Sequence, residues 1–130
     1  MNSAAEARFR LPVGAAVARA VKVIALDPAC DRLVASRGGI SFDHAGRSLS
    51  GPPPDLVVMV VTAGSDAPAA ARIGQICSDR RITTATFVVR AASVTDEELS
   101  RTLAQVRPWS LMVVITNDDD YVEDILRSFR

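Results

Sequence analysis

Polar and charged side chains gather in this sequence where apolar, β-branched runs end. Asp27 closes one run, the Thr-Ala-Gly-Ser-Asp stretch 62–66 closes a second, and Asn117 and Asp118 follow the last. If these runs are parallel strands, the residues stand at the edge where such sheets bind ligands. The pattern therefore predicts one shared rim, made of Asp27, Ser65, Asp66, Asn117 and Asp118.

The segment "VVTAGSDAPAAARIG", residues 60–74, is a strand-to-helix junction of the kind that holds phosphate groups in α/β proteins. Phosphate binding there needs glycines, because bare backbone N–H groups must approach the anion closely. This junction has Ser65 and Asp66 instead, and Pro68 lacks an N–H group. We expect the Asp66 carboxylate to satisfy the free helix N–H groups and to repel phosphate.

Two other acidic patterns have simpler explanations than catalysis or metal binding. A phosphorylated receiver domain would need a lysine on the rim, but the only lysine, Lys22, lies at the amino-terminal end of an expected strand. The run "NDDD", residues 117–120, has oxygen ligands for a divalent cation. Carboxylates at a helix start also cap it and interact favourably with its dipole. We favour the cap and expect no metal.

The remaining reactive side chains lack partners in the sequence. Cys30 and Cys77 are far apart, and with a single histidine they do not supply a tetrahedral zinc site. A disulfide is an alternative to the buried free thiols that we expect. His44 lies in a loop and is expected to be solvated, and Trp109 is expected to pack at a helix–strand junction.

The elements that must position these residues alternate along the chain. We expect a strand at 7–13, a helix at 14–20, one or two helical turns at 29–37, and a loop or short hairpin at 38–55. The clearer strands are 21–27, 56–62, 82–89 and 111–116, and the clearer helices are 66–79, 95–107 and 120–129. The apolar runs 56–62 and 111–116 are typical of strands that are covered on both faces. The order predicts a single domain, 1–130: a three-layer, Rossmann-like α/β fold with a mostly parallel sheet of about four to five strands, flanked by helices.

Composition excludes several classes of function. The 130 residues carry 15 basic and 15 acidic side chains, so net charge gives no reason to expect nucleic-acid binding. With 48% hydrophobic residues the chain is typical of a globular protein. It shows neither a signal peptide nor a run of membrane-spanning length, and we expect a cytoplasmic protein.

Three segments together resemble the nucleotide domain of the tubulin/FtsZ family. They are "LPVGAAVARAVKVIALDPACDRLVASR" at 11–37, the Ala63-Gly64 start with its "APAAARI" helix opening, and "LMVVITND" at 111–118. The resemblance spans roughly residues 11 to 120, and it implies a GTP-binding fold from a polymer-forming lineage. This chain differs from the family in both phosphate-binding loops. The family's first glycine cluster is reduced to Gly14, and its GGGTGTG stretch is replaced by Ser65-Asp66. The sequence also stops before the family's catalytic acidic loop. GTP hydrolysis by this chain alone is therefore not expected, nor is a bound cofactor.

Three hypotheses for function follow. The first is a non-catalytic, FtsZ-like module that acts by protein interaction or self-association, as a homo-oligomer or with a protein partner. The alternative is a small-molecule or nucleotide-binding domain that uses the rim, and a third is a hydrolase or transferase subunit that uses Asp27 or Cys30. The candidate ligand contacts are Gly14, Asp27, Thr62, Ala63, Gly64, Ser65, Asp66, Arg90, Asn117 and Asp118.

Overall fold

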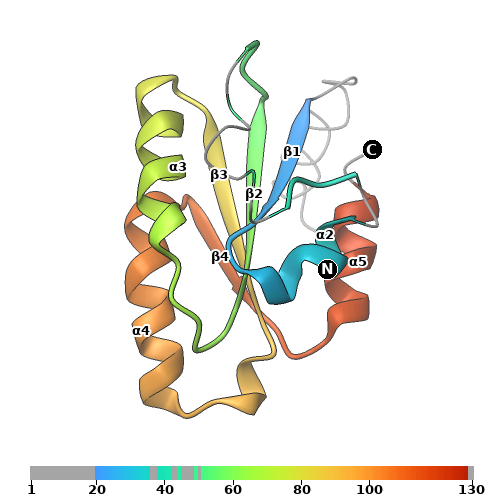
Figure 1. The fold of residues 1–130 in the computed structure, drawn as a ribbon, viewed down its shortest axis with the longest axis vertical. Helices are drawn as coiled ribbons and strands as arrows, with labels where there is room; N and C mark the ends of the chain where they lie inside the picture. The colour runs from blue at the N-terminus through green and yellow to red at the C-terminus, as the bar shows by residue number, and fades with distance from the viewer. Residues whose placement is uncertain (1–19, 36–37, 42–43, 45–48, 50, 129–130) are drawn as a thin grey trace, which may run out of the picture.

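A four-stranded parallel sheet organises the computed structural model, which describes residues 20–35, 38–41, 44, 49 and 51–128. The strands are β1 (Val21–Ala25), β2 (Leu56–Thr62), β3 (Thr83–Val89) and β4 (Met112–Ile115). They lie in the order β1-β2-β3-β4, and all three neighbouring pairs are parallel. All carboxyl ends therefore meet at one edge, which is at the bottom of Figure 1.

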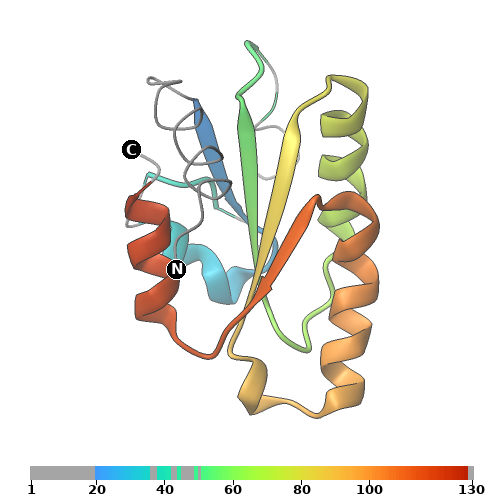
Figure 2. The same ribbon diagram turned by 180° about the vertical axis from the view of Figure 1, so that it is seen from behind.

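Helices connect the strands and cover both faces of the sheet. They are α2 (Asp31–Ala35), α3 (Pro68–Asp79), α4 (Asp96–Val106) and α5 (Asp119–Arg127), with 3₁₀ turns η1 (Pro28–Cys30), η3 (Ala91–Ser93) and η4 (Arg107–Trp109). Helices α3 and α4 pack on one face, and α2 and α5 pack on the other (Figures 1 and 2). The three-layer α/β architecture expected from the sequence is thus confirmed.

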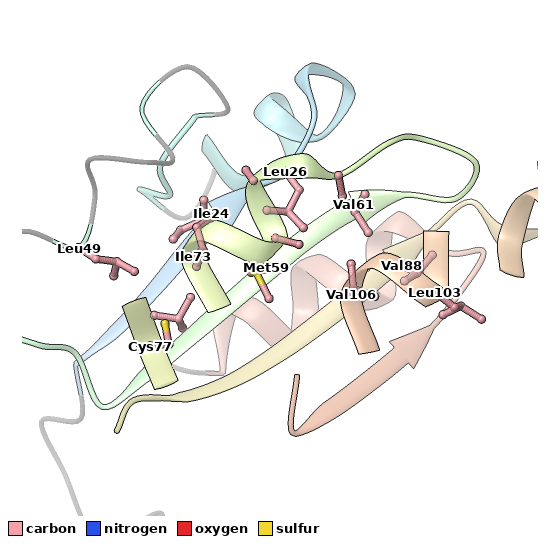
Figure 3. Packing of buried hydrophobic residues seen from close by; sticks show 14 of the residues in the cluster. Ile24, Leu26, Leu49, Met59, Val61, Ile73, Cys77, Val88, Leu103 and Val106 are labelled. Atoms are coloured by element: carbon pink, nitrogen blue, oxygen red, sulfur yellow. The ribbon is translucent and has the colours of Figure 1, made fainter. Parts of the chain in front are cut away.

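Each face of the sheet has its own apolar core. On the first face, Ile73 and Cys77 of α3 and Val106 of α4 belong to one buried cluster with Met59 and Val61 of β2 (Figure 3). On the other face, side chains of η1, α2 and α5 cover the alternate residues of the strands: Cys30, Leu33, Val34, Val122 and Leu126. The central strand β2 is buried on both sides, as its continuous apolar sequence predicts.

The last strand is not the doubly covered strand that its sequence suggests. Leu111 and Met112 are exposed by 80% and 52%, and Ile115 by 44%. Only Val113 and Val114 are half-buried, one against each core cluster. The prediction was wrong because β4 lies at the edge of the sheet, beyond β3, where flanking helices cover it only in part (Figure 2).

At the β1 side of the sheet, successive segments of the chain are added on opposite sides of β1. Ile40 forms an isolated parallel bridge with Ile24 on the outer side of β1, whereas β2 pairs with the inner side. The backbone of Ile40 donates to Val23 O and accepts from Ala25 N–H. The strand order thus reverses around β1, and such a point creates a crevice between the loops that follow the two strands.

Some sequence-based expectations lie outside the described residues. They include the strand 7–13, almost all of the helix 14–20, Gly14 as a ligand contact, and the final residue of the helix 120–129. None of the helices within the described ranges is long and apolar enough to cross a membrane.

Candidate functional site

The crevice at the strand-order reversal is filled by the protein's own carboxylate. Asp27 follows β1 and is only 5% exposed. Its Oδ2 accepts the Thr62 N–H at 2.7 Å, and its Oδ1 accepts the Thr62 hydroxyl at 3.3 Å and the Cys30 N–H at 3.1 Å. Asp27 therefore joins the end of β2 to the first turn after β1, and it caps η1.

The Cys30 thiol lies in the same cluster but is poorly suited to act as a nucleophile. Its Sγ is 3.4 Å from Thr62 Oγ1, and the side chain is fully buried. Burial, only partly offset by the Thr62 hydroxyl, raises the pKa of Cys30 to about 12, because a buried thiolate loses its hydration. The neutral thiol expected from the sequence is therefore the form present near neutral pH.

Cys77 is likewise a free, buried thiol, in α3 on the opposite face of the sheet. Burial raises its pKa to about 11. We expect both native thiols to react with a disulfide reagent at pH 8 at least about a hundredfold more slowly than in the denatured chain. A rate equal to that of the denatured chain at either cysteine would contradict their placement.

The same two thiols make the free energy of unfolding depend on pH in the alkaline range. Both have a higher pKa in the folded chain than the ordinary value of 9.0, so folding favours the protonated form. The contribution of the two thiols to the free energy of unfolding is complete below about pH 9, and it is lost as the pH rises through the folded pKa values.

The β2–α3 turn, which resembles a phosphate cradle in the sequence, has its amides already paired. Gly64 N–H donates to Thr102 Oγ1 at 2.8 Å, and Ala67 N–H donates to Gln105 Oε1 at 2.7 Å. Ser65 N–H donates to Thr62 O, and the Thr102 hydroxyl also bonds Ser65 O. Two side chains of α4 thus take the donors that an anion would need.

Asp66 does not cap α3, contrary to our expectation. It is exposed, and the helix begins after Ala67 without a side-chain cap. The reason is that Gln105, from α4, has taken the Ala67 amide, and Pro68 has no N–H to donate. Gly64 adopts φ +87° in this turn, a conformation that glycine tolerates best.

The acidic run after β4 caps α5, as predicted. Asp118 Oδ1 accepts the Asp120 N–H at 2.9 Å, and Asp119 and Asp120 lie in the first turn. Asn117 Oδ1 accepts the Ala92 N–H and so ties this loop to the one after β3. Nowhere in the described part of the chain do three potential metal-ligating side chains come together.

An open part of the rim lies between α2 and α5. A pocket of about 330 Å³ is bounded there by the start of α2, the end of β3 and the first turns of α5. Arg90 and Asp119 line it and pair at 3.0 Å, between Nη2 and Oδ2. Of the candidate ligand contacts that the structure describes, Arg90 alone lines this pocket.

Sequence reasoning missed several residues that shape the rim. Thr102 and Gln105 hold the β2–α3 turn. Asp119 was expected as part of the acidic run 117–120, but its pairing with Arg90 was not. Thr102 had a detectable signal, because it is a polar residue inside the buried stripe of its helix. Trp109 packs against the core as expected, His44 is exposed, and Lys22 lies in β1 away from the carboxyl ends of the strands.

No family model, curated protein or solved structure matches this chain. The resemblance to the tubulin/FtsZ family accordingly has no support beyond the sequence motifs themselves.

Proposed function

We propose that this protein is a non-catalytic, FtsZ-like α/β domain that acts by self-association, with the exposed edge of β4 as the contact between two copies. The observation that carries the proposal is the exposure of Met112 and Ile115 in this edge strand and of Leu111 just before it. Tyr121, at the start of α5, is also 49% exposed. Large apolar side chains grouped on one edge are typical of a surface that a partner covers.

The edge also lacks the features that normally prevent strand pairing. Soluble proteins protect edge strands with lysine, proline or a bulge. The four residues of β4, Met-Val-Val-Ile, include no charge and no proline. This edge therefore favours addition of a further strand.

A second copy fits the spacing of the side chains. A two-fold axis perpendicular to the sheet, passing by Val113, would pair two β4 strands antiparallel and keep each face of the sheet continuous. Leu111 and Ile115 are each two residues from Val113 and lie on its face by the alternation of a strand. Leu111 of one copy would then lie opposite Ile115 of the second copy, twice in each dimer.

The charges at the two ends of β4 support the antiparallel arrangement. Arg107 is exposed before the strand, and Asp118 and Asp120 are exposed after it. Antiparallel pairing brings the basic end of one copy toward the acidic end of the other, whereas parallel pairing would bring like charges together.

The non-catalytic part of the proposal rests on the rim. The Asp27 carboxylate is engaged in three hydrogen bonds, and the pKa of Cys30 is raised to about 12. The Gly64, Ser65 and Ala67 amides of the turn that resembles a phosphate cradle are paired within the chain. The motifs that resemble a polymer-forming family point in the same direction.

Sedimentation of the wild type and of edge variants tests the proposal. We expect the Leu111→Lys/Ile115→Lys variant to dimerise at least about tenfold more weakly, because two like-charged pairs face each other in the register above. Leu111→Lys/Ile115→Glu would place opposite charges in the same positions and restore part of the affinity.

Ala71→Lys/Ala104→Lys, at exposed positions of α3 and α4, adds the same two charges elsewhere and serves as the control. A wild type that stays monomeric at about 1 mM, the limit of weak association, would refute self-association. A dimer that tolerates two lysines at this edge would refute the interface.

A further inference from the structure

The pocket between α2 and α5 combines apolar and charged side chains of both signs. Pro28 and Leu33 supply apolar surface, and Arg32, Arg90, Asp119 and Glu123 supply the charges. Its volume of about 330 Å³ is near the lower end of the range for small-molecule sites, about 300–1,000 Å³. It also lies beyond the carboxyl ends of the parallel strands, where α/β sheets bind ligands.

Asp119 places a carboxylate at the wall of this pocket. Its Oδ2 pairs with Arg90, but its Oδ1 is buried and has no hydrogen-bond partner among the described residues. A buried carboxylate oxygen without a donor is costly, and native proteins seldom keep one. Asp119 therefore adds negative charge to the wall of the pocket, with one of its oxygens paired to Arg90.

Arg90 is held in an unusual backbone conformation at the same place. Its φ of 60° and ψ of 41° are left-handed, which is uncommon for a residue other than glycine. Arg81 also has a positive φ, but it follows the end of α3, where such a conformation is ordinary. Arg90 instead follows a strand, and strained residues in such positions are frequent at ligand sites.

The other two charged side chains are available. Neither Arg32 nor Glu123 has an ion-pair partner within the described part of the chain. An anion at this site would be repelled by Asp119 and Glu123, and a cation would be repelled by Arg32. A molecule that carries both charges avoids each penalty.

We propose that this pocket binds a small zwitterion of the size of a free α-amino acid. The ligand carboxylate pairs with Arg32, and its ammonium group pairs with Glu123, beside the negative charge of Asp119. The ligand side chain lies against Pro28 and Leu33. This function is additional to self-association, because the pocket does not include the exposed side chains of β4.

Thermal denaturation with each of the twenty L-amino acids, at about 10 mM, tests the class of ligand. We expect at least one to raise the melting temperature by several degrees, because a ligand that binds only the folded state stabilises it. The corresponding simple carboxylic acid, the simple amine and inorganic phosphate should produce no such rise. No rise with any amino acid, or an equal rise with the acid or with phosphate alone, would overturn the proposal.

Variants of the two available charges test the placement. Arg32→Gln and Glu123→Gln should each weaken binding of the responding amino acid at least about tenfold, since each removes one ionic contact. Arg101→Gln and Glu97→Gln, exposed on α4, make the same chemical changes away from the pocket and should leave affinity unchanged.

Unchanged affinity in both pocket variants would refute the site. The Leu111→Lys/Ile115→Lys variant should bind the amino acid normally, so that failure of ligand binding and failure of self-association are separate results.

Discussion

Replacing Asp27 with alanine is expected to lower the free energy of unfolding by about 3 to 5 kcal/mol. The carboxylate is buried, and it accepts the backbone N–H groups of Thr62 and Cys30 as well as the Thr62 hydroxyl. Its removal leaves these donors without an acceptor, and each unsatisfied buried donor costs about 1–3 kcal/mol. Urea denaturation of both proteins, analysed for midpoint and slope, measures the difference.

Two further variants make this result specific. Asp27→Asn retains one carbonyl oxygen, but its amide group meets an N–H donor, so we expect an intermediate loss of about 1–2 kcal/mol. Asp66→Ala removes an exposed carboxylate that does not cap α3, and it should change stability by less than about 0.5 kcal/mol. A loss of less than about 1 kcal/mol for Asp27→Ala would mean that Asp27 is not the structural link between the two strand ends.

Asp27 also shows which part of the rim could be predicted. Its position beyond β1 followed from the sequence, because an apolar run that ends in Asp-Pro predicts a strand end. Its partner Thr62 is 35 residues away. Whether a rim side chain is free for a ligand or used by the protein depends on such distant contacts, which spacing along the chain does not reveal.

Local patterns were more informative than long-range ones. The strand 56–62 was predicted with the bounds that β2 has, and the capping box of Thr95 and Glu98 forms as its spacing predicts. Accordingly, hydrogen bonds from the Thr95 backbone and hydroxyl lower the pKa of Glu98. Both features depend on neighbours within a few residues.

The edge strand β4 was misjudged for the same reason. Its sequence, Met-Val-Val-Ile, is as apolar as that of a central strand. An apolar run indicates that its side chains are buried, but it does not indicate where the strand lies in the sheet. The order of the strands depends on how the connections cross the sheet. An apolar edge strand therefore looks central in sequence, and it is central in fact only if a second copy completes the sheet.

Replacing Gly74 with alanine is expected to destabilise the protein by about 1–2 kcal/mol, although alanine normally favours a helix by about 1 kcal/mol over glycine. Gly74 is buried in α3 where the helix meets η4. An added Cβ would lie 2.6 Å from Trp109 Cγ and 2.7 Å from Cδ2, and it would also clash with Trp109 Cβ. Overpacking of this kind typically costs about 1–3 kcal/mol, and here it also outweighs the helix preference.

The position of the clash determines which second substitution relieves it. Rotating the indole cannot remove the contact with Trp109 Cβ, so Gly74→Ala should remain unfavourable in a Trp109→Ala background. In a Trp109→Gly background, where no Cβ is present, the same change should become neutral or stabilising, and a double-mutant cycle measures this coupling. Ala71→Gly, at an exposed position of α3, calibrates the helix preference at about 1 kcal/mol. If Gly74→Ala stabilises the wild type by that amount, α3 and η4 are not in the close contact that brings the end of α4 and the start of β4 against the core.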